Sequence, residues 1–146
     1  MDRKEFIKTC GIACLGGSAL SVFLQSCASA NYFAAATFTE NKIVLPKTEF
    51  VRTENAKITQ RKYVLVKTEK LNYPVCIYKT GDEEYTALLL ECTHKGCELH
   101  PSGDYLICPC HGSEFTNKGI VSNPPAEENL RTFLITTDHE NIYIQL

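Results

Sequence analysis

Four of the eight cysteines in this 146-residue chain lie in two short segments that also carry histidine. The segments are "CTHKGC", residues 92–97, and "CPCHGS", residues 108–113. Only 13 residues separate His94 from Cys108, enough for one short hairpin built on the turn "PSGD". Each segment follows a run that is typical of a strand. We therefore expect two Cys/His loops that lie side by side.

The two loops offer one cysteine and one histidine each. Cys92 and His94 have the spacing C-x-H, and Cys108 and His111 have the spacing C-x-x-H. Two thiolates and two imidazoles are a set that zinc accepts in a tetrahedron. A structural zinc-binding module is therefore one interpretation of these residues. Zinc leaves the second cysteine of each segment unexplained.

From Lys42 onward, short runs of β-branched and aromatic residues recur about every ten residues, with turn sequences between them. No stretch beyond Phe38 keeps an amphipathic helical period for three turns. The runs are "IVL", "KITQRKYVLVK", "VCIYK", "EYTALLLE", "DYLIC", "GIVS", "LRTFLITT" and "NIYIQL". We expect an all-β fold over residues 42–146, a small antiparallel sandwich or barrel.

Composition excludes some functions. With 44% hydrophobic and 22% charged residues, the chain is ordinary for one globular domain. Its net charge of −2 and the lack of a clustered Lys/Arg stripe argue against nucleic acid as a partner. The chain also offers no recognisable substrate pocket, so we expect a carrier rather than a complete enzyme.

The N-terminus has the pattern of an export signal or a membrane anchor. Residues 1–8, "MDRKEFIK", are followed by no charged residue from Thr9 to Thr39. The stretch "DRKEFIK" resembles a twin-arginine export signal with Lys4 in place of the second arginine.

The tetrapeptide "LQSC" resembles a lipoprotein cleavage box that would make Cys27 the lipidated residue. A retained transmembrane helix and a plain secretory cleavage remain open as alternatives, since about 20 apolar residues span a bilayer. We expect residues 1–27 to be signal or anchor and 28–41 a linker. All three alternatives place the domain outside the cytoplasm, on the periplasmic side of a bacterial membrane.

The paired segments "CTHKGC" and "CPCHGS" closely resemble the signature of Rieske iron–sulfur proteins, specifically the branch with a disulfide between the loops. The resemblance implies one [2Fe–2S] cluster, with Cys92 and Cys108 on one iron and His94 and His111 on the other. It also implies a Rieske-type sandwich with a cluster-binding part at about residues 88–134.

By the same resemblance, Cys97 and Cys110 form a disulfide that ties the two loops together. Closing a loop of about 14 residues stabilises a fold by about 3 kcal/mol in the chain-entropy model. A disulfide also needs an oxidising compartment, which agrees with the export signal.

In the family, the serine after "CPCHG" and a tyrosine two positions later donate hydrogen bonds to cluster or ligand sulfur. This chain has Ser113 but Phe115 at the tyrosine position. One hydrogen bond fewer predicts a potential in the lower part of the Rieske range. The segment "SNPPAEENL" resembles the family's Gly-Pro-Ala loop, with Pro124 in place of glycine.

The resemblance implies a membrane-anchored electron-transfer subunit of a quinol-oxidising respiratory complex with a cytochrome-type acceptor. Lys95, where quinol-oxidising members usually carry leucine, favours a second hypothesis. That hypothesis is an electron relay of another exported redox enzyme, similar to the small subunit of arsenite oxidase, or a free lipid-anchored carrier.

Among the remaining residues, Cys76 alternates with apolar neighbours and is expected to be a buried strand thiol. Tyr105, Phe115 and Phe133 are expected in the core. His139 lies in a turn sequence and is expected at the surface.

Overall fold

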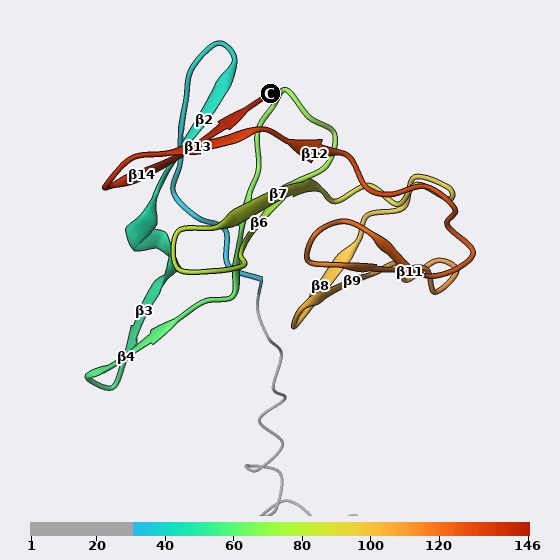
Figure 1. Ribbon diagram of the computed structural model, residues 1–146, viewed down its shortest axis with the longest axis horizontal. Helices are drawn as coiled ribbons and strands as arrows, with labels where there is room; N and C mark the ends of the chain where they lie inside the picture. The colour runs from blue at the N-terminus through green and yellow to red at the C-terminus, as the bar shows by residue number, and fades with distance from the viewer. Residues whose placement is uncertain (1–30) are drawn as a thin grey trace, which may run out of the picture. The chain divides into compact units, whose positions relative to one another are not determined.

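The computed structural model describes residues 31–146, and the predicted signal and lipidation residue Cys27 lie outside them. The described residues form an all-β, antiparallel fold (Figure 1), which confirms the predicted class. The helical element found within these residues is one short 3-10 helix, η2 (Lys47–Phe50). No helix within residues 31–146 is both long enough and apolar enough to cross a membrane.

Within residues 31–146 the strands form three four-stranded sheets and one hairpin. The base sheet has the order β1 (Thr37–Phe38), β2 (Lys42–Pro46), β14 (Asn141–Gln145) and β13 (Ile135–Thr137). The central sheet has the order β12 (Thr132–Phe133), β7 (Tyr85–Leu89), β6 (Val75–Lys79) and β5 (Tyr63–Val66). The loop sheet has the order β11 (Val121–Asn123), β10 (Glu114–Thr116), β9 (Tyr105–Ile107) and β8 (His100–Ser102). The hairpin consists of β3 (Val51–Glu54) and β4 (Lys57–Gln60).

The central sheet is buried on both faces. Successive side chains of a strand point to opposite faces. In β6, Val75 and Ile77 join a first core with the base sheet, whereas Cys76 and Tyr78 join a second core with the loop sheet. Burial on both faces explains why these strands are near-continuous apolar runs. The predicted sandwich is therefore extended by a third layer.

The second core supports the two Cys/His loops. It contains Leu106 of β9 and Phe115 of β10, and also Cys92 and Cys108 themselves. The cysteines of the predicted ligand set thus lie at the edge of a packed apolar layer. Cys76 is fully buried in this core, as the sequence predicts.

Two features of the loop sheet differ from the prediction. The sequence predicts a turn at Pro101, but this residue lies in β8, an edge strand where the missing N–H of proline costs no ladder bond. The expectation that Tyr105 is a core residue is wrong, because its side chain is 48% exposed. Its neighbour Leu106 takes the inward position of β9, and alternation turns Tyr105 outward.

Part of the segment expected as a linker, residues 28–41, is hydrogen-bonded to the domain. The backbone N–H of Ala34 donates to Leu65 at 2.8 Å, and that of Leu65 donates to Tyr32 at 3.0 Å. The Arg61 guanidinium lies 3.7 Å from the centre of the Tyr32 ring. Residues 32–34 therefore belong to the folded unit.

Candidate functional site

The two Cys/His segments are loops that follow the ends of β7 and β9, and they have the same backbone design. The N–H of Gly96 donates to the Cys92 carbonyl at 2.8 Å, and the N–H of Gly112 donates to the Cys108 carbonyl at 3.0 Å. Both glycines have a φ in the left-handed region, +73° and +78°. A residue with a Cβ is strained in this region, so each loop needs its glycine.

A second hydrogen bond closes each loop. Cys92 N–H donates to the Cys97 carbonyl at 2.9 Å, and Cys108 N–H donates to the Ser113 carbonyl at 2.8 Å. The first cysteine of each loop is thus tied to the backbone on both sides. These bonds fix the backbone of both cysteines.

The structure places the four predicted ligand residues in two neighbouring pairs, one of thiols and one of imidazoles. Cys92 and Cys108 are 2% and 1% exposed. Burial raises the pKa of the Cys92 thiol, N–H groups of His94 and Lys95 oppose this rise, and the adjacent Cys108 thiol adds to it. The rings of His94 and His111 meet edge to face with centroids 4.9 Å apart. The two thiols are therefore adjacent to each other, and so are the two imidazoles, of which His111 is exposed.

His94 has an unpaired ring nitrogen. Its Nδ1 atom is buried and has no hydrogen-bond partner among the described residues. A buried polar atom without a partner is costly, and native proteins rarely leave one unexplained. Neutral imidazole nitrogen is a common metal ligand. The unpaired Nδ1 of His94, whose ring contacts a second imidazole, fits a bound metal centre.

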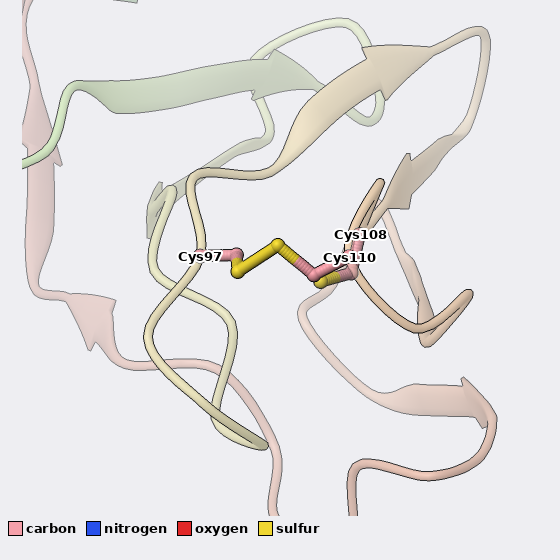
Figure 2. Close-up of side chains that lie close together, drawn as sticks. All are labelled: Cys97, Cys108 and Cys110. Carbon is pink, nitrogen blue, oxygen red and sulfur yellow. A yellow bond between two sulfur atoms is a disulfide. The ribbon is translucent and has the colours of Figure 1, made fainter.

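The second cysteines of the loops form the disulfide that the resemblance implies. Cys97 and Cys110 are bonded at 2.01 Å with their Cα atoms 6.5 Å apart. Figure 2 shows the bond crossing to the loop that carries both Cys108 and Cys110. The sulfur atoms of these three cysteines lie within 4.8 Å of one another. Since two of them are bonded to each other, only Cys108 of this group has a free thiol.

The segment 122–130, which resembles the family's third loop, is bound to both Cys/His loops. The Asn123 amide donates to the Gly112 carbonyl at 3.0 Å. The Thr93 hydroxyl donates to the Glu128 carbonyl at 2.7 Å. The replacement of glycine by proline in this segment therefore leaves it in contact with the site.

Ser113 is fully buried, and its Oγ accepts a hydrogen bond from the N–H of Ala126 at 3.0 Å. Because the oxygen acts as the acceptor, the hydroxyl proton stays free to donate to another group. Phe115 is also fully buried and brings no hydroxyl. The donor set around the site thus differs by one hydroxyl from that expected with tyrosine.

Comparison with known proteins shows the family. The sequence profile of the Rieske [2Fe-2S] domain matches residues 41–134. The chain belongs to the Rieske [2Fe–2S] family. The family match supports a [2Fe–2S] cluster as the cofactor in place of zinc. Two adjacent buried thiols, two touching imidazoles and the unpaired Nδ1 of His94 fit such a cluster.

Named relatives support the assignment. The ubiquinol-cytochrome c reductase iron-sulfur subunit of Bradyrhizobium diazoefficiens is 38% identical over 55 residues, 36% of this chain and 31% of that protein. The cytochrome b6-f complex iron-sulfur subunit of Chlorobaculum tepidum is 30% identical over 63 residues, 42% of this chain and 35% of that protein. The matches thus span about a third of these relatives.

Among solved structures, the plasma membrane Rieske protein PetC3 from Synechocystis is similar. It is 30% identical, with a TM-score of 0.52, and the match covers 58% of this chain and 87% of PetC3. The match supports a Rieske fold over more than half of the chain.

Sequence reasoning missed two side chains that hold the loop 92–97. They are Thr93, bonded to Glu128, and Tyr73, whose hydroxyl donates to the Gly96 carbonyl. These contacts join residues 35 and 23 positions apart. No local pattern marks them, because they depend on how separate elements pack.

Proposed function

We propose that the protein is an electron carrier whose cluster is held by Cys92 and Cys108 on one iron and by His94 and His111 on the other. When bound, such a cluster takes up and releases one electron at a higher potential than an all-cysteine cluster. The observation that carries the proposal is the buried, unpartnered Nδ1 of His94 beside the second imidazole.

The surrounding residues suit this role. Burial of the two cysteines excludes water from the sulfur side of the site. The free hydroxyl proton of Ser113 is available to a sulfur acceptor, which favours the reduced state. His111 is exposed and gives a redox partner direct access to the imidazole side.

We propose a membrane-bound, quinol-oxidising complex with a cytochrome-type acceptor as the partner. Support comes from the relatives, which are subunits of ubiquinol-cytochrome c reductase and of the cytochrome b6-f complex by name. Residues 1–27 would hold the domain on the periplasmic side of a bacterial membrane, by lipid at Cys27 or by an uncleaved helix.

A second candidate partner is another exported redox enzyme, with this protein as a relay subunit similar to that of arsenite oxidase or as a free carrier. One observation favours it. A cleft of about 330 Å³ beside His94 is lined by Glu91, Lys95, Glu128 and Arg131. A charged rim suits a polar protein surface better than an apolar quinone pocket.

The proposal is tested on the purified protein by its visible spectrum, its acid-labile sulfide and the rhombic paramagnetic signal after reduction. We expect His94→Ala and His111→Ala each to abolish the signal. His100→Ala and His139→Ala, at exposed positions, serve as controls and keep it. A colourless wild-type protein, or a His94→Ala variant with the wild-type signal, contradicts the ligand assignment.

A further inference from the structure

Three contacts join the loop 92–97 to three separate segments of the chain. Cys97 is bonded to the neighbouring loop, and Thr93 donates to Glu128. The third contact is the hydrogen bond from the Tyr73 hydroxyl to the Gly96 carbonyl. Cys110 and Glu128 lie in loops at the site, whereas Tyr73 lies two residues before strand β6 and packs against the first core. The third contact therefore connects the loop 92–97 to the packed layer formed by the base and central sheets.

Tyr73 is well suited to be this attachment. Its ring is half-buried and packs against the first core, between the base and central sheets. The next residue, Pro74, accepts a hydrogen bond at 3.0 Å from the N–H of Leu90, at the end of the strand that leads into the loop. The Tyr73 hydroxyl therefore projects from a rigid position.

The Gly96 peptide is a sensitive point of the loop. Gly96 lies two residues after His94, and its N–H closes the turn on the Cys92 carbonyl. Its φ of +73° is accessible to glycine and also leaves the loop free to adopt other conformations. The hydrogen bond from the Tyr73 hydroxyl to the Gly96 carbonyl restricts this freedom and holds the backbone between Cys92 and Cys97.

We propose that Tyr73 is a positioning residue, which orients His94 toward the cluster through the Gly96 carbonyl. This inference rests on the proposed function. The hydroxyl also places the positive end of its dipole on the loop, which favours the more negative, reduced state of the site. Without the hydroxyl, the loop 92–97 becomes more mobile, and the reduced state loses the stabilisation by the hydroxyl dipole.

The test compares Tyr73→Phe with Tyr85→Phe. Both variants lose one hydroxyl from a half-buried ring on the first core, but the Tyr85 hydroxyl donates to no described residue. In Tyr73→Phe we expect amide exchange in residues 92–97 to become about fivefold faster, as the loss of one hydrogen bond implies. We also expect a lower midpoint potential and a broader rhombic signal. Tyr85→Phe should match the wild type in all three measurements.

The outcomes separate the two proposals. A wild-type protein without the rhombic signal overturns the proposed function. A normal wild-type signal, together with unchanged exchange, potential and line shape in Tyr73→Phe, overturns the positioning role alone. If Tyr73→Phe fails to fold, Tyr73→Met also fills the apolar site without a hydroxyl, and the same results are expected of it.

Discussion

Cys108 and Cys110 are separated by one proline and yet perform different tasks. Cys108 is buried in the second core with a free thiol, whereas Cys110 is exposed and bonded to Cys97. In a regular strand, two residues that are two positions apart point to the same face of the sheet. After β9 the chain leaves the strand and turns at Pro109, so one side chain is buried and the other reaches Cys97. This turn lets one tripeptide serve both the site and the bridge.

Phe115 gives a prediction at the same scale. A hydroxyl at this position would donate to a ligand sulfur in the manner of the family's tyrosine. We expect Phe115→Tyr to raise the midpoint potential by about 60 mV, the equivalent of one tenfold change for one electron. Redox titration measures it. The control Phe133→Tyr also adds a hydroxyl to a buried ring, but in the first core. An unchanged potential in Phe115→Tyr contradicts the tuning argument.

At the scale of elements, the hairpin of β3 and β4 carries a strained turn. Its two central residues, Asn55 and Ala56, have φ values of 48° and 62°. Such a turn favours Asn-Gly, because an L-residue with a Cβ is disfavoured in this region. We expect Ala56→Gly to stabilise the protein by about 0.5–1 kcal/mol in urea unfolding. Asn55→Gly should gain less, since asparagine tolerates the region. Equal stability of wild type and Ala56→Gly contradicts the prediction.

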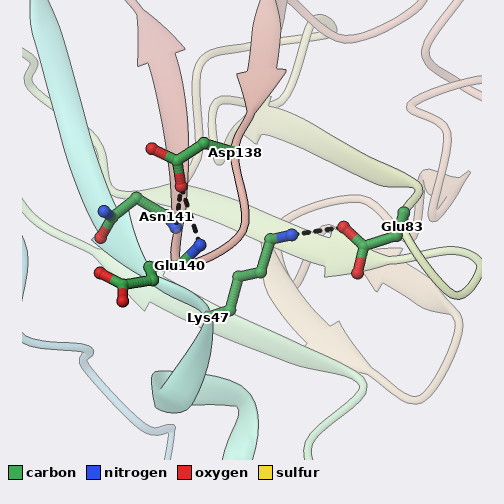
Figure 3. Close-up of polar contacts among 5 residues, drawn as sticks. All are labelled: Lys47, Glu83, Asp138, Glu140 and Asn141. Atoms are coloured by element: carbon green, nitrogen blue, oxygen red, sulfur yellow. Dashed lines mark hydrogen bonds and ion pairs between the residues drawn. The ribbon is translucent and has the colours of Figure 1, made fainter.

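The turn between β13 and β14 is organised by Asp138 (Figure 3). Its carboxylate accepts hydrogen bonds from the Tyr143 hydroxyl at 2.6 Å and from the N–H groups of Asn141 and Glu140 at 2.7 and 2.8 Å. These donors hold the pKa of Asp138 at about 2. Next to this turn, the backbone N–H of Lys47 donates to the Glu140 carbonyl, and the Lys47 side chain forms an ion pair with Glu83 in the turn between β6 and β7.

The lowered pKa of Asp138 predicts a pH-dependent contribution to stability. The ordinary pKa of aspartate is about 3.9, so the ionised side chain stabilises the fold fully above about pH 4. This contribution is lost as the pH falls toward about 2. We expect Asp138→Asn to lower the urea midpoint at pH 6 and to differ little from wild type near pH 2. Asp82→Asn, in another turn, is the control. A difference that does not change with pH would falsify the assignment.

At the scale of the whole molecule, the Cys97–Cys110 disulfide joins the loop that follows β7 to the loop that follows β9. Their sequence separation is 13 residues, for which the chain-entropy model gives about 3 kcal/mol. We expect the double variant Cys97→Ala/Cys110→Ala to melt roughly 10 °C below wild type. Calorimetry measures this difference. A thiol reductant should lower the wild-type melting temperature and leave that of the double variant unchanged. If both proteins melt together, the disulfide has no stabilising role.

Strong local patterns predicted much of the fold. The run "VCIYK" is strand β6 from its first residue to its last, because apolar side chains on both faces leave little alternative to a central strand. By contrast, β8 and β10 have three residues each. So short a strand shows no period, and its existence depends on pairing with β9.

The sequence by itself determined the chemistry of the site, because each loop holds its cysteine, histidine and glycine within five residues. Local backbone geometry is enough to present those groups. The tertiary structure decided what holds the loops in place. Two contacts join segments that are distant along the chain, those of Tyr73 with Gly96 and of Thr93 with Glu128. The third layer also depends on such long-range packing. Such contacts are a property of how three sheets pack, and neither partner carries a local sign of the other.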